Sequence, residues 1–308
     1  MPKSQMDNIK PLYDAIQMHR RQYSSGGADY SVTTLLNPPR VVFLNKRHLS
    51  DVDLFVEDLI HSYNGTGSHE YWERMLNLIP NSPYECETRL SHTISNRKIS
   101  GAFDCVYDGH TMYDMKNTSV WKMMFGDKFD WAAQQNIYRW LYWKTRGQIL
   151  KQLKIIGLFR DWSVREKQRS GKNYPSYPVM EIKLPVWDLD ETLEFMTERV
   201  DLMIKYEDTP DDELPLCSYE DMWSEPDKVA VMSTRLKSRA VRVLSDMKTA
   251  KNFVSKYLTN PTCKDSVQTL SYQIRQCERR RCKDWCPVNK YCNQYHDYLK
   301  QEAKNAIK

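Results

Sequence analysis

A tight turn between two strand-like segments constrains the fold of this chain more than any other feature. Residues 99–107 and 111–117 both have the composition of β-strands, and Asp108-Gly109 lies between them. An Asp-Gly pair between two such runs is a strong signal for a β-hairpin, because both turn positions require a positive φ that these residues tolerate. With a further strand-like stretch at 85–93, the sequence predicts three consecutive strands.

Acidic residues and a lysine occupy this predicted hairpin. Asp104 lies in its first strand, and Asp114 and Lys116 lie in its second, where alternation places both side chains on one face. Two carboxylates can hold a hard divalent cation, and a lysine beside them can meet the attacking water or the phosphate. The pattern therefore indicates a metal-dependent phosphodiesterase, although an exposed edge strand with a salt bridge would carry the same residues.

Polar residues on two flanking helices extend the candidate site. His69 follows the glycine-rich turn 64–67 at the predicted start of a helix, where a neutral imidazole could bind a metal. Gln134 and Tyr138 are four residues apart on a predicted helix over 127–145, so they share a face and could orient the lysine or a phosphate. A histidine with no ligand and a buried polar pair remain the alternative interpretations.

The order of the remaining elements indicates an α/β fold. Helices precede the three strands, a long helix follows them, and further strands and a helix complete the unit. This alternation favours helices layered on a mixed sheet. The other predicted elements are helices over 7–22, 50–63, 189–206 and 245–258, strands over 152–162 and 179–186, and a hairpin over 228–244.

A shift in composition divides the chain. An acidic linker, Asp208 to Glu213, separates the α/β region from a cysteine-rich tail. We therefore expect an N-terminal helical region over 1–64, a core over 65–207 and a C-terminal subdomain over 208–308. A chain of 308 residues is long enough for a large domain with an appended module.

Four short motifs occur in an order that resembles a known enzyme family. They are Gly65-x3-His69, Gly101-x2-Asp104, Asp114-x-Lys116 and Gln134-x3-Tyr138. In this order they resemble the RecB-like nucleases of the PD-(D/E)XK superfamily, and most of all bacteriophage-encoded members and the CRISPR-associated RecB-like exonuclease with its iron–sulfur cluster. The resemblance covers about residues 30–300 and departs from the commoner pattern in one respect, since the second acid is Asp114 rather than Glu.

The resemblance implies a PD-(D/E)XK restriction-endonuclease-like core, in which helices flank a mixed central sheet, with N-terminal helices and a C-terminal cysteine-rich subdomain. It implies that Mg²⁺ or Mn²⁺ is bound by His69, Asp104, Asp114 and the backbone carbonyl of Met115. Lys116 would activate the water and stabilise the developing charge, supported by Gln134 and Tyr138. Glu73 and Glu87 are nearby acids that could assist or could be solvated surface.

By the same resemblance, the expected activity is exonucleolytic hydrolysis at DNA ends, in the recombination, repair or replication of a bacteriophage. The expected partners are DNA, either single-stranded or at its ends, and phage recombination or replication proteins. Two alternatives remain open: a nuclease that acts on RNA, and a non-catalytic DNA-binding or assembly module that keeps the fold.

Three closely spaced cysteines near the C-terminus indicate a second metal site. They are Cys282, Cys286 and Cys292, and Pro287 follows the second of them. Three thiolates and a remote fourth can hold Zn²⁺ or an iron–sulfur cluster, and the resemblance favours [4Fe–4S] over zinc. Cys217 is the preferred fourth ligand, with Cys277 and Cys86 as competitors, and buried or free thiols are the alternative interpretation.

Basic side chains gather after the predicted strand over 152–162. They are Arg160, Arg165, Lys167, Arg169 and Lys172, interleaved with Trp162 and Tyr174. Because phosphates pair with cations and bases stack on aromatic rings, this segment is predicted to bind single-stranded DNA, although a solvated loop would look similar. The net charge of +5 is by itself too small to identify a polyanionic partner.

The sequence carries no sign of export or membrane insertion. Its N-terminal residues lack the apolar core of a signal peptide, and no apolar run approaches the roughly 20 residues of a membrane span. We therefore expect an intracellular protein with no membrane partner, in the cytoplasm of a bacterial host. Eight cysteines in that reducing compartment favour metal ligation over disulfides.

Overall fold

The computed structural model describes residues 10–22, 26–48, 56–236 and 239–306. The chain forms two compact units. The first comprises Met1–Asn37 and Asp51–Asp208, and the second comprises Pro38–Ser50 and Thr209–Lys308. The three regions predicted from the sequence, with boundaries at residues 64 and 207, stay a prediction.

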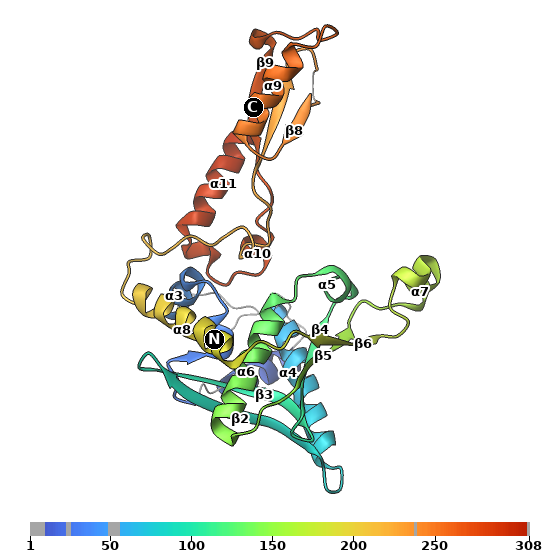
Figure 1. The fold of residues 1–308 in the computed structure, drawn as a ribbon, viewed down its shortest axis with the longest axis vertical. Coiled ribbons are helices and arrows are strands. Elements are labelled where there is room, and N and C mark those ends of the chain that lie inside the picture. Colours follow the sequence, from blue (N-terminus) through green and yellow to red (C-terminus); the bar gives the residue numbers. More distant parts are fainter. Residues whose placement is uncertain (1–9, 23–25, 49–55, 237–238, 307–308) are drawn as a thin grey trace. The chain divides into compact units, whose positions relative to one another are not determined.

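A mixed six-stranded sheet forms the framework of the first unit (Figure 1). β2 pairs antiparallel along the whole length of β3, and β1 and β4 share the other edge of β3. β4 runs parallel to β5, which is antiparallel to β6. The strands are β1 (Tyr30–Ser31), β2 (Tyr84–Ile94), β3 (Arg97–Tyr107), β4 (Thr111–Thr118), β5 (Gln152–Phe159) and β6 (Val179–Leu184).

Three long helices pack around this sheet (Figure 1). α4 (Val56–Asn77) and α6 (Phe129–Arg146) both contact β2, β3 and β4, and α8 (Leu189–Tyr206) packs against α6. Phe103 of β3 and Tyr142 of α6 meet edge to face, with ring centroids 5.7 Å apart. The predicted α/β core, a mixed central sheet flanked by helices, is therefore confirmed.

Local signals account for the turn and the helix limits that the sequence predicts. Asp108 and Gly109 adopt φ values of 49° and 57°, as the tight hairpin between β3 and β4 requires. α6 ends at Gly147, whose φ of 70° is left-handed and whose N–H donates to the Trp143 carbonyl. At the start of α8, the side chains of Asp188 and Glu191 form a capping box.

The predicted turn at residues 64–67 is wrong, because one helix, α4, runs through it. Gly65 and Gly67 each cost a helix interior roughly 1 kcal/mol relative to alanine, but that cost does not end the helix. The hydroxyls of Thr66 and Ser68 donate to backbone carbonyls one turn earlier, at 3.2 and 2.8 Å. The helices predicted over 7–22 and 50–63 appear as α1 (Lys10–Gln22) and the first turns of α4, and residues 7–9 and 50–55 lie outside the described residues.

Short capped helices connect the longer elements of the first unit and were not predicted, because they are too short for a hydrophobic period. Ser119 Oγ caps α5 by accepting the N–H of Lys122 at 3.1 Å. Ser163 Oγ caps α7 by accepting the N–H of Glu166 at 3.1 Å. These connecting helices are α2 (Val32–Leu35), α5 (Val120–Phe125), α7 (Val164–Ser170) and the 3-10 turn η1 (Gly171–Asn173).

A three-stranded antiparallel sheet, in the order β8-β7-β9, forms part of the second unit. α9 packs on β7 and β8, where Ala250, Val229 and Val231 form a small core. The hairpin predicted over 228–244 and the helix predicted over 245–258 appear as β7–β8 and α9. The unit contains α3 (Pro39–His48), β7 (Lys228–Ser233), β8 (Arg242–Leu244), α9 (Met247–Leu258), η2 (Val267–Thr269), β9 (Leu270–Arg275), α10 (Arg280–Asp284), η3 (Asn289–Tyr291) and α11 (Asn293–Ala306).

A buried arginine ties α3 to the rest of the second unit. Arg40 donates to the Pro215 carbonyl at 3.0 Å, to the Leu214 carbonyl, and to Asn293 Oδ1 at 2.5 Å. These bonds explain how a segment far away in the sequence belongs to the C-terminal unit. Within the described residues, no helix is both long and apolar enough to cross a membrane.

Candidate active site

The motif Gly101 to Asp104 lies where one edge of β3 is divided between two partners. On that edge β1 pairs with residues 99–100 and β4 pairs with residues 105–107, so the motif falls between them. The Asp104 carboxylate bridges part of this gap, since its Oδ2 accepts the backbone N–H of Met115 at 2.8 Å. The carboxylate is thereby fixed at an opening in the sheet.

An imidazole and two carboxylates converge at this opening. His69 Nδ1, from α4, lies 3.2 Å from Asp104 Oδ2 and 3.8 Å from Glu87 Oε1 of β2. Among the described residues, these three form the one group of at least three histidine, cysteine or acidic side chains whose ligand atoms lie within 4.8 Å of one another. Oxygen-rich sets of this kind suit Mg²⁺ or Mn²⁺, and the imidazole adds a nitrogen ligand.

Backbone strain accompanies Glu87, the third member of the cluster. Glu87 adopts a φ of 45°, which is left-handed and costs a residue with a Cβ atom about 1 kcal/mol or more. It lies between two regular pairs of the β2–β3 ladder, Cys86 with Cys105 and Thr88 with Phe103. An irregular backbone thus brings the Glu87 carboxylate to the cluster.

The charge of His69 is set by the two carboxylates beside it. Burial lowers the pKa of His69, but hydrogen bonds to Asp104 and Glu87 and the charge of Asp104 outweigh burial and raise the pKa to about 10. A pKa in this range keeps the imidazole charged at neutral pH, and its single positive charge offsets part of the negative charge of the two carboxylates. A divalent cation bound here would displace the imidazole proton.

A buried acid and a lysine form the second half of the site. Asp114 is 1% exposed, and Lys116 Nζ lies 2.9 Å from its Oδ1 and 2.8 Å from its Oδ2. Burial raises the pKa of Asp114, and the charge of Lys116 opposes the rise. For Lys116 burial lowers the pKa, but the charges of Asp114 and Asp104 outweigh it and raise the pKa, so the ammonium form is retained.

Amide side chains of α6 orient this pair. Gln134 Oε1 accepts from Lys116 Nζ at 3.1 Å, and Gln134 Nε2 donates to the Tyr138 hydroxyl at 3.4 Å. Gln135 Nε2 donates to Asp114 Oδ1 at 3.1 Å. Adjacent glutamines on one helix therefore hold the lysine and the acid separately.

The glycine of the Gly101 motif has a steric purpose. A Cβ atom at Gly101 would lie 2.5 Å from Cε1 of Tyr138 and 2.9 Å from Cγ2 of Val32. Both distances are shorter than real Cβ contacts, so only glycine lets Tyr138 approach β3 this closely. Burial raises the pKa of Tyr138, so the phenol stays protonated and able to donate.

The structure brings together most of the residues that the sequence singled out. His69 and Asp104 meet in the cluster, and Asp114, Lys116, Gln134 and Tyr138 are joined by the ion pair and hydrogen bonds just described. Asp114 is not part of the three-residue cluster, where Glu87 stands instead. Glu87 was expected only as a helper, and Gln135 was missed, although its position next to Gln134 was a usable signal.

The predicted DNA-binding segment forms an arm after β5 (Figure 1). α7 carries Arg165, Lys167 and Arg169, the turn η1 carries Lys172, and Arg160 follows the end of β5. Arg160 Nη1 is 2.8 Å from His61 Nδ1 of α4. The predicted stacking residues are used inside the arm, since Trp162 Nε1 donates to the Pro175 carbonyl and the Tyr174 hydroxyl to the Asp161 carbonyl.

In the second unit, four cysteines line one small cavity. They are Cys217, Cys282, Cys286 and Cys292. The other candidates for the fourth ligand do not line this cavity. Cys86 is the strand neighbour of Cys105 in the register of β2 and β3, and Cys277 Sγ lies 3.4 Å from the Pro226 carbonyl. Burial raises the pKa of Cys217 to about 12 and that of Cys282 to about 11, so these thiols stay protonated unless a cation binds them.

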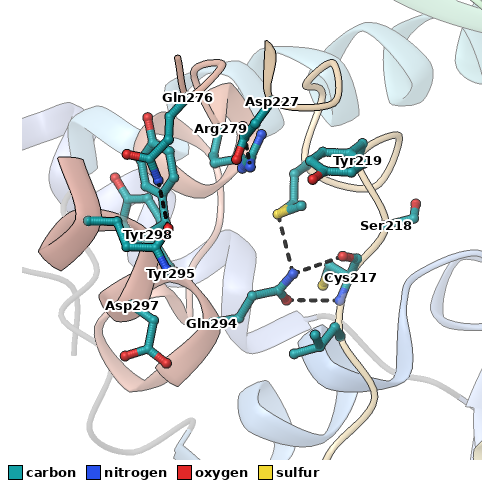
Figure 2. A pocket seen from close by; sticks show the side chains of 13 residues that line it. Cys217, Ser218, Tyr219, Asp227, Gln276, Arg279, Gln294, Tyr295, Asp297 and Tyr298 are labelled. Atoms are coloured by element: carbon teal, nitrogen blue, oxygen red, sulfur yellow. Dashed lines mark hydrogen bonds and ion pairs between the residues drawn. The ribbon is translucent and has the colours of Figure 1, made fainter. Parts of the chain in front are cut away.

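A side chain of α11 fixes the remote cysteine in place. Gln294 Oε1 accepts the N–H of Cys217, and Gln294 Nε2 donates to the Cys217 carbonyl, each at 2.9 Å (Figure 2). The same Nε2 lies 3.6 Å from Met222 Sδ. These contacts also form the floor of an open pocket of about 370 Å³ beside the cysteines, where Arg279 is already paired with Asp227 at 2.8 Å.

Comparisons with known proteins show only distant likenesses. No protein-family model matches the chain, and no curated protein matches it. The solved structure of SSO0001 is similar with a TM-score of 0.44 and 16% identity, over 67% of this chain and 89% of that chain. A structure from Eubacterium rectale, provisionally named as an exonuclease, is similar with a TM-score of 0.30 and 10% identity, over 63% of this chain and 73% of that chain. At these scores the likenesses carry no argument about function.

Proposed function

We propose that the chain is a metal-dependent nuclease that hydrolyses phosphodiester bonds in DNA. One observation carries the proposal: the His69, Glu87 and Asp104 ligand atoms converge within 4.8 Å, beside a buried ion pair between Asp114 and Lys116. A bound cation and a fixed ammonium can act together on one phosphate, the cation on the attacking water and the ammonium on the developing negative charge. The fold, a mixed sheet flanked by helices, is compatible with this assignment.

The donor set fits a hard divalent cation, Mg²⁺ or Mn²⁺. His69, Glu87 and Asp104 would hold it, and Asp114 and the Met115 carbonyl are further proposed ligands from the motif resemblance. Asp114 is buried and its Oδ2 lies 2.8 Å from Lys116 Nζ, so a cation bound there would share this carboxylate with the ammonium. When bound, the cation would supply Lewis-acid chemistry and a water of lowered pKa.

Side chains of the protein hold the positive charge of Lys116 in place. Lys116 is held by Asp114 on one side and by Gln134 on the other, so its ammonium is fixed before substrate arrives. A fixed cation stabilises the negative charge that develops on the phosphate oxygens without further reorganisation. Tyr138 and Gln134 restrict Lys116 to this position, and Gln135 does the same for Asp114.

The proposal extends to exonuclease action at DNA ends, in phage recombination, repair or replication. The order of the four sequence motifs supports this extension, and the basic arm from Arg160 to Lys172 supports DNA as the partner. Arg165, Lys167 and Arg169 lie on α7, of which no residue is buried. Arg169 pairs with Glu166 at 3.5 Å and Lys167 donates to the Ser176 carbonyl, and these exposed contacts can be exchanged for phosphates.

For the cysteines we propose a structural [4Fe–4S] cluster held by Cys217, Cys282, Cys286 and Cys292. Tetrahedral zinc with Zn–S bonds of ~2.3 Å would require sulfur atoms roughly 3.8 Å apart. Among the described residues no three cysteine sulfurs lie within 4.8 Å of one another. Four cysteines line one cavity, which suits a four-sulfur site, and the resemblance of the sequence motifs favours the iron–sulfur cluster over zinc.

Cleavage of end-labelled DNA by anaerobically purified protein tests the proposal. Single- and double-stranded substrates are incubated with and without Mn²⁺, and iron and zinc are measured in the same sample. We expect Mn²⁺-dependent cleavage that Asp104→Asn abolishes and that Asp108→Asn, a matched change in the hairpin turn, leaves intact. Cleavage that is equal in wild type and Asp104→Asn would refute the proposed site, and a zinc-loaded, iron-free sample would refute the cluster.

A further inference from the structure

Two large aromatic rings on α5 are exposed and lie next to each other. Trp121 is 70% exposed and Phe125 is 63% exposed, and their ring centroids are 4.8 Å apart with an interplanar angle of 46°. On the opposite side of this helix, Val120 and Met123 are buried and anchor it. Large aromatic side chains that gather on a surface mark an interaction site, because burial would otherwise stabilise them.

The position of α5 connects these rings to the candidate active site. α5 begins two residues after β4, the strand that carries Asp114 and Lys116, and lies beyond its end in Figure 1. Asp161 Oδ1 accepts the N–H of Val120 at 2.8 Å, and the Arg160 N–H donates to the Thr118 carbonyl at 3.0 Å. α5 is therefore fixed between the strand with the proposed catalytic lysine and the start of the basic arm.

The excess of positive charge near these rings comes from the basic arm, because Lys122 and Lys128 are matched in number by Asp127 and Asp130. In the arm, five basic residues stand against two acids: Arg160, Arg165, Lys167, Arg169 and Lys172 against Asp161 and Glu166. Lys122 lies on α5 itself, with its Nζ 5.5 Å from the ring centroid of Trp131. Lys128 Nζ donates to the Gly126 carbonyl at 2.9 Å, just after the helix, and the basic arm begins on the other side at Arg160. Cations that flank exposed rings suit a nucleic-acid strand, whose phosphates pair with the cations and whose bases stack on the rings.

We propose that Trp121 and Phe125 form a base-stacking platform that binds single-stranded DNA next to the active site. The proposal rests on the nuclease function and deepens it, because it names an unpaired strand as the form of substrate that is held. Internal bases of a duplex are already stacked on both faces, so they cannot lie on these rings without leaving the helix. Trp162 and Tyr174, which the sequence suggested for stacking, hydrogen-bond within the arm through their polar edges, so their role in stacking stays a prediction.

Binding of a fluorescein-labelled single strand of about 12 nucleotides, measured by anisotropy without divalent cations, tests the platform. We expect Trp121→Ala and Phe125→Ala each to weaken binding about tenfold, the conversion of a typical stacking contribution per base. The affinity of each alanine variant for an abasic strand with the same number of phosphates should differ less than twofold from that of wild type. Tyr272→Ala, an exposed aromatic of β9 in the second unit, is the matched control and should bind like wild type.

Two further measurements keep the result unambiguous. Because both rings are exposed, the alanine variants should keep the wild-type melting temperature, and Trp121→Tyr with Phe125→Tyr should restore binding by restoring two rings. The platform would be overturned by alanine variants that bind the single strand as tightly as wild type. It would also be overturned if their affinity for the abasic strand fell as much as their affinity for the normal strand. Wild-type protein that shows no cleavage with Mn²⁺ would instead overturn the nuclease function, a result separate from the binding data.

Discussion

Replacement of Gly101 by alanine isolates one steric requirement of the site. The backbone of Gly101 does not need a positive φ, so alanine brings no backbone strain and only adds a methyl group. That methyl would lie 2.5 Å from Cε1 of Tyr138 and 2.9 Å from Cγ2 of Val32. Both neighbours must move, and overpacking of this kind typically costs about 2 kcal/mol.

The expected loss can be measured as a shift in thermal unfolding. For a unit of this size, about 2 kcal/mol corresponds to a fall in melting temperature of about 4–8 °C. Nuclease activity should fall further than stability, because a displaced Tyr138 no longer restrains Gln134 and the lysine that Gln134 holds. The cost of Gly101→Ala should be smaller in a Tyr138→Ala background, since the closest clash is gone.

Gly65→Ala and Gly67→Ala are the matched controls. No described atom lies within 4 Å of a Cβ atom at either position, and both lie within α4. Alanine should therefore stabilise the helix by about 1 kcal/mol at each position. If Gly101→Ala leaves both melting temperature and activity unchanged, the packing of Tyr138 against β3 has been described wrongly.

Three further predictions address the rest of the chain. Gln135→Leu should lower activity at least tenfold without lowering the melting temperature, because it removes an Asp114 contact together with a buried Oε1 that accepts no hydrogen bond from a described residue. A lower melting temperature with full activity would contradict this. Cys217→Ser should reduce both bound iron, measured by metal analysis, and the melting temperature, measured by calorimetry, whereas Cys277→Ser should change neither. Equal loss of iron in the two variants would contradict the choice of Cys217 as a ligand. Arg40→Ala should lower the melting temperature through three lost hydrogen bonds, and an unchanged value would show that they contribute little.

Much of the fold could be predicted from local signals. The Asp108-Gly109 turn, the strands beside it and the α8 helix follow from turn chemistry and hydrophobic period, which act within a few residues. α4 shows the limit of that approach. Gly65 and Gly67 look like a turn in sequence, but the cost of two glycines is smaller than the gain from continuing a packed helix.

The candidate site likewise has a part that local sequence patterns predict and a part that they do not. Asp114 and Lys116 could be paired from strand alternation alone, and the ion pair bears this out. Two features of the cluster could not be predicted: the left-handed residue in β2 that brings Glu87 to His69, and the divided edge of β3 at which Asp104 lies. Both features arise from tertiary pairing, which no local pattern in the sequence records.

The role of Lys116 is the most direct test of the nuclease account. The measurement is the single-turnover rate of hydrolysis of end-labelled DNA at saturating Mn²⁺, for wild type and for Lys116→Met. Loss of one fixed charge-stabilising group typically reduces such a rate by about 10²–10³-fold. The account predicts a fall of that size with DNA binding retained, and equal rates in the two proteins would contradict it.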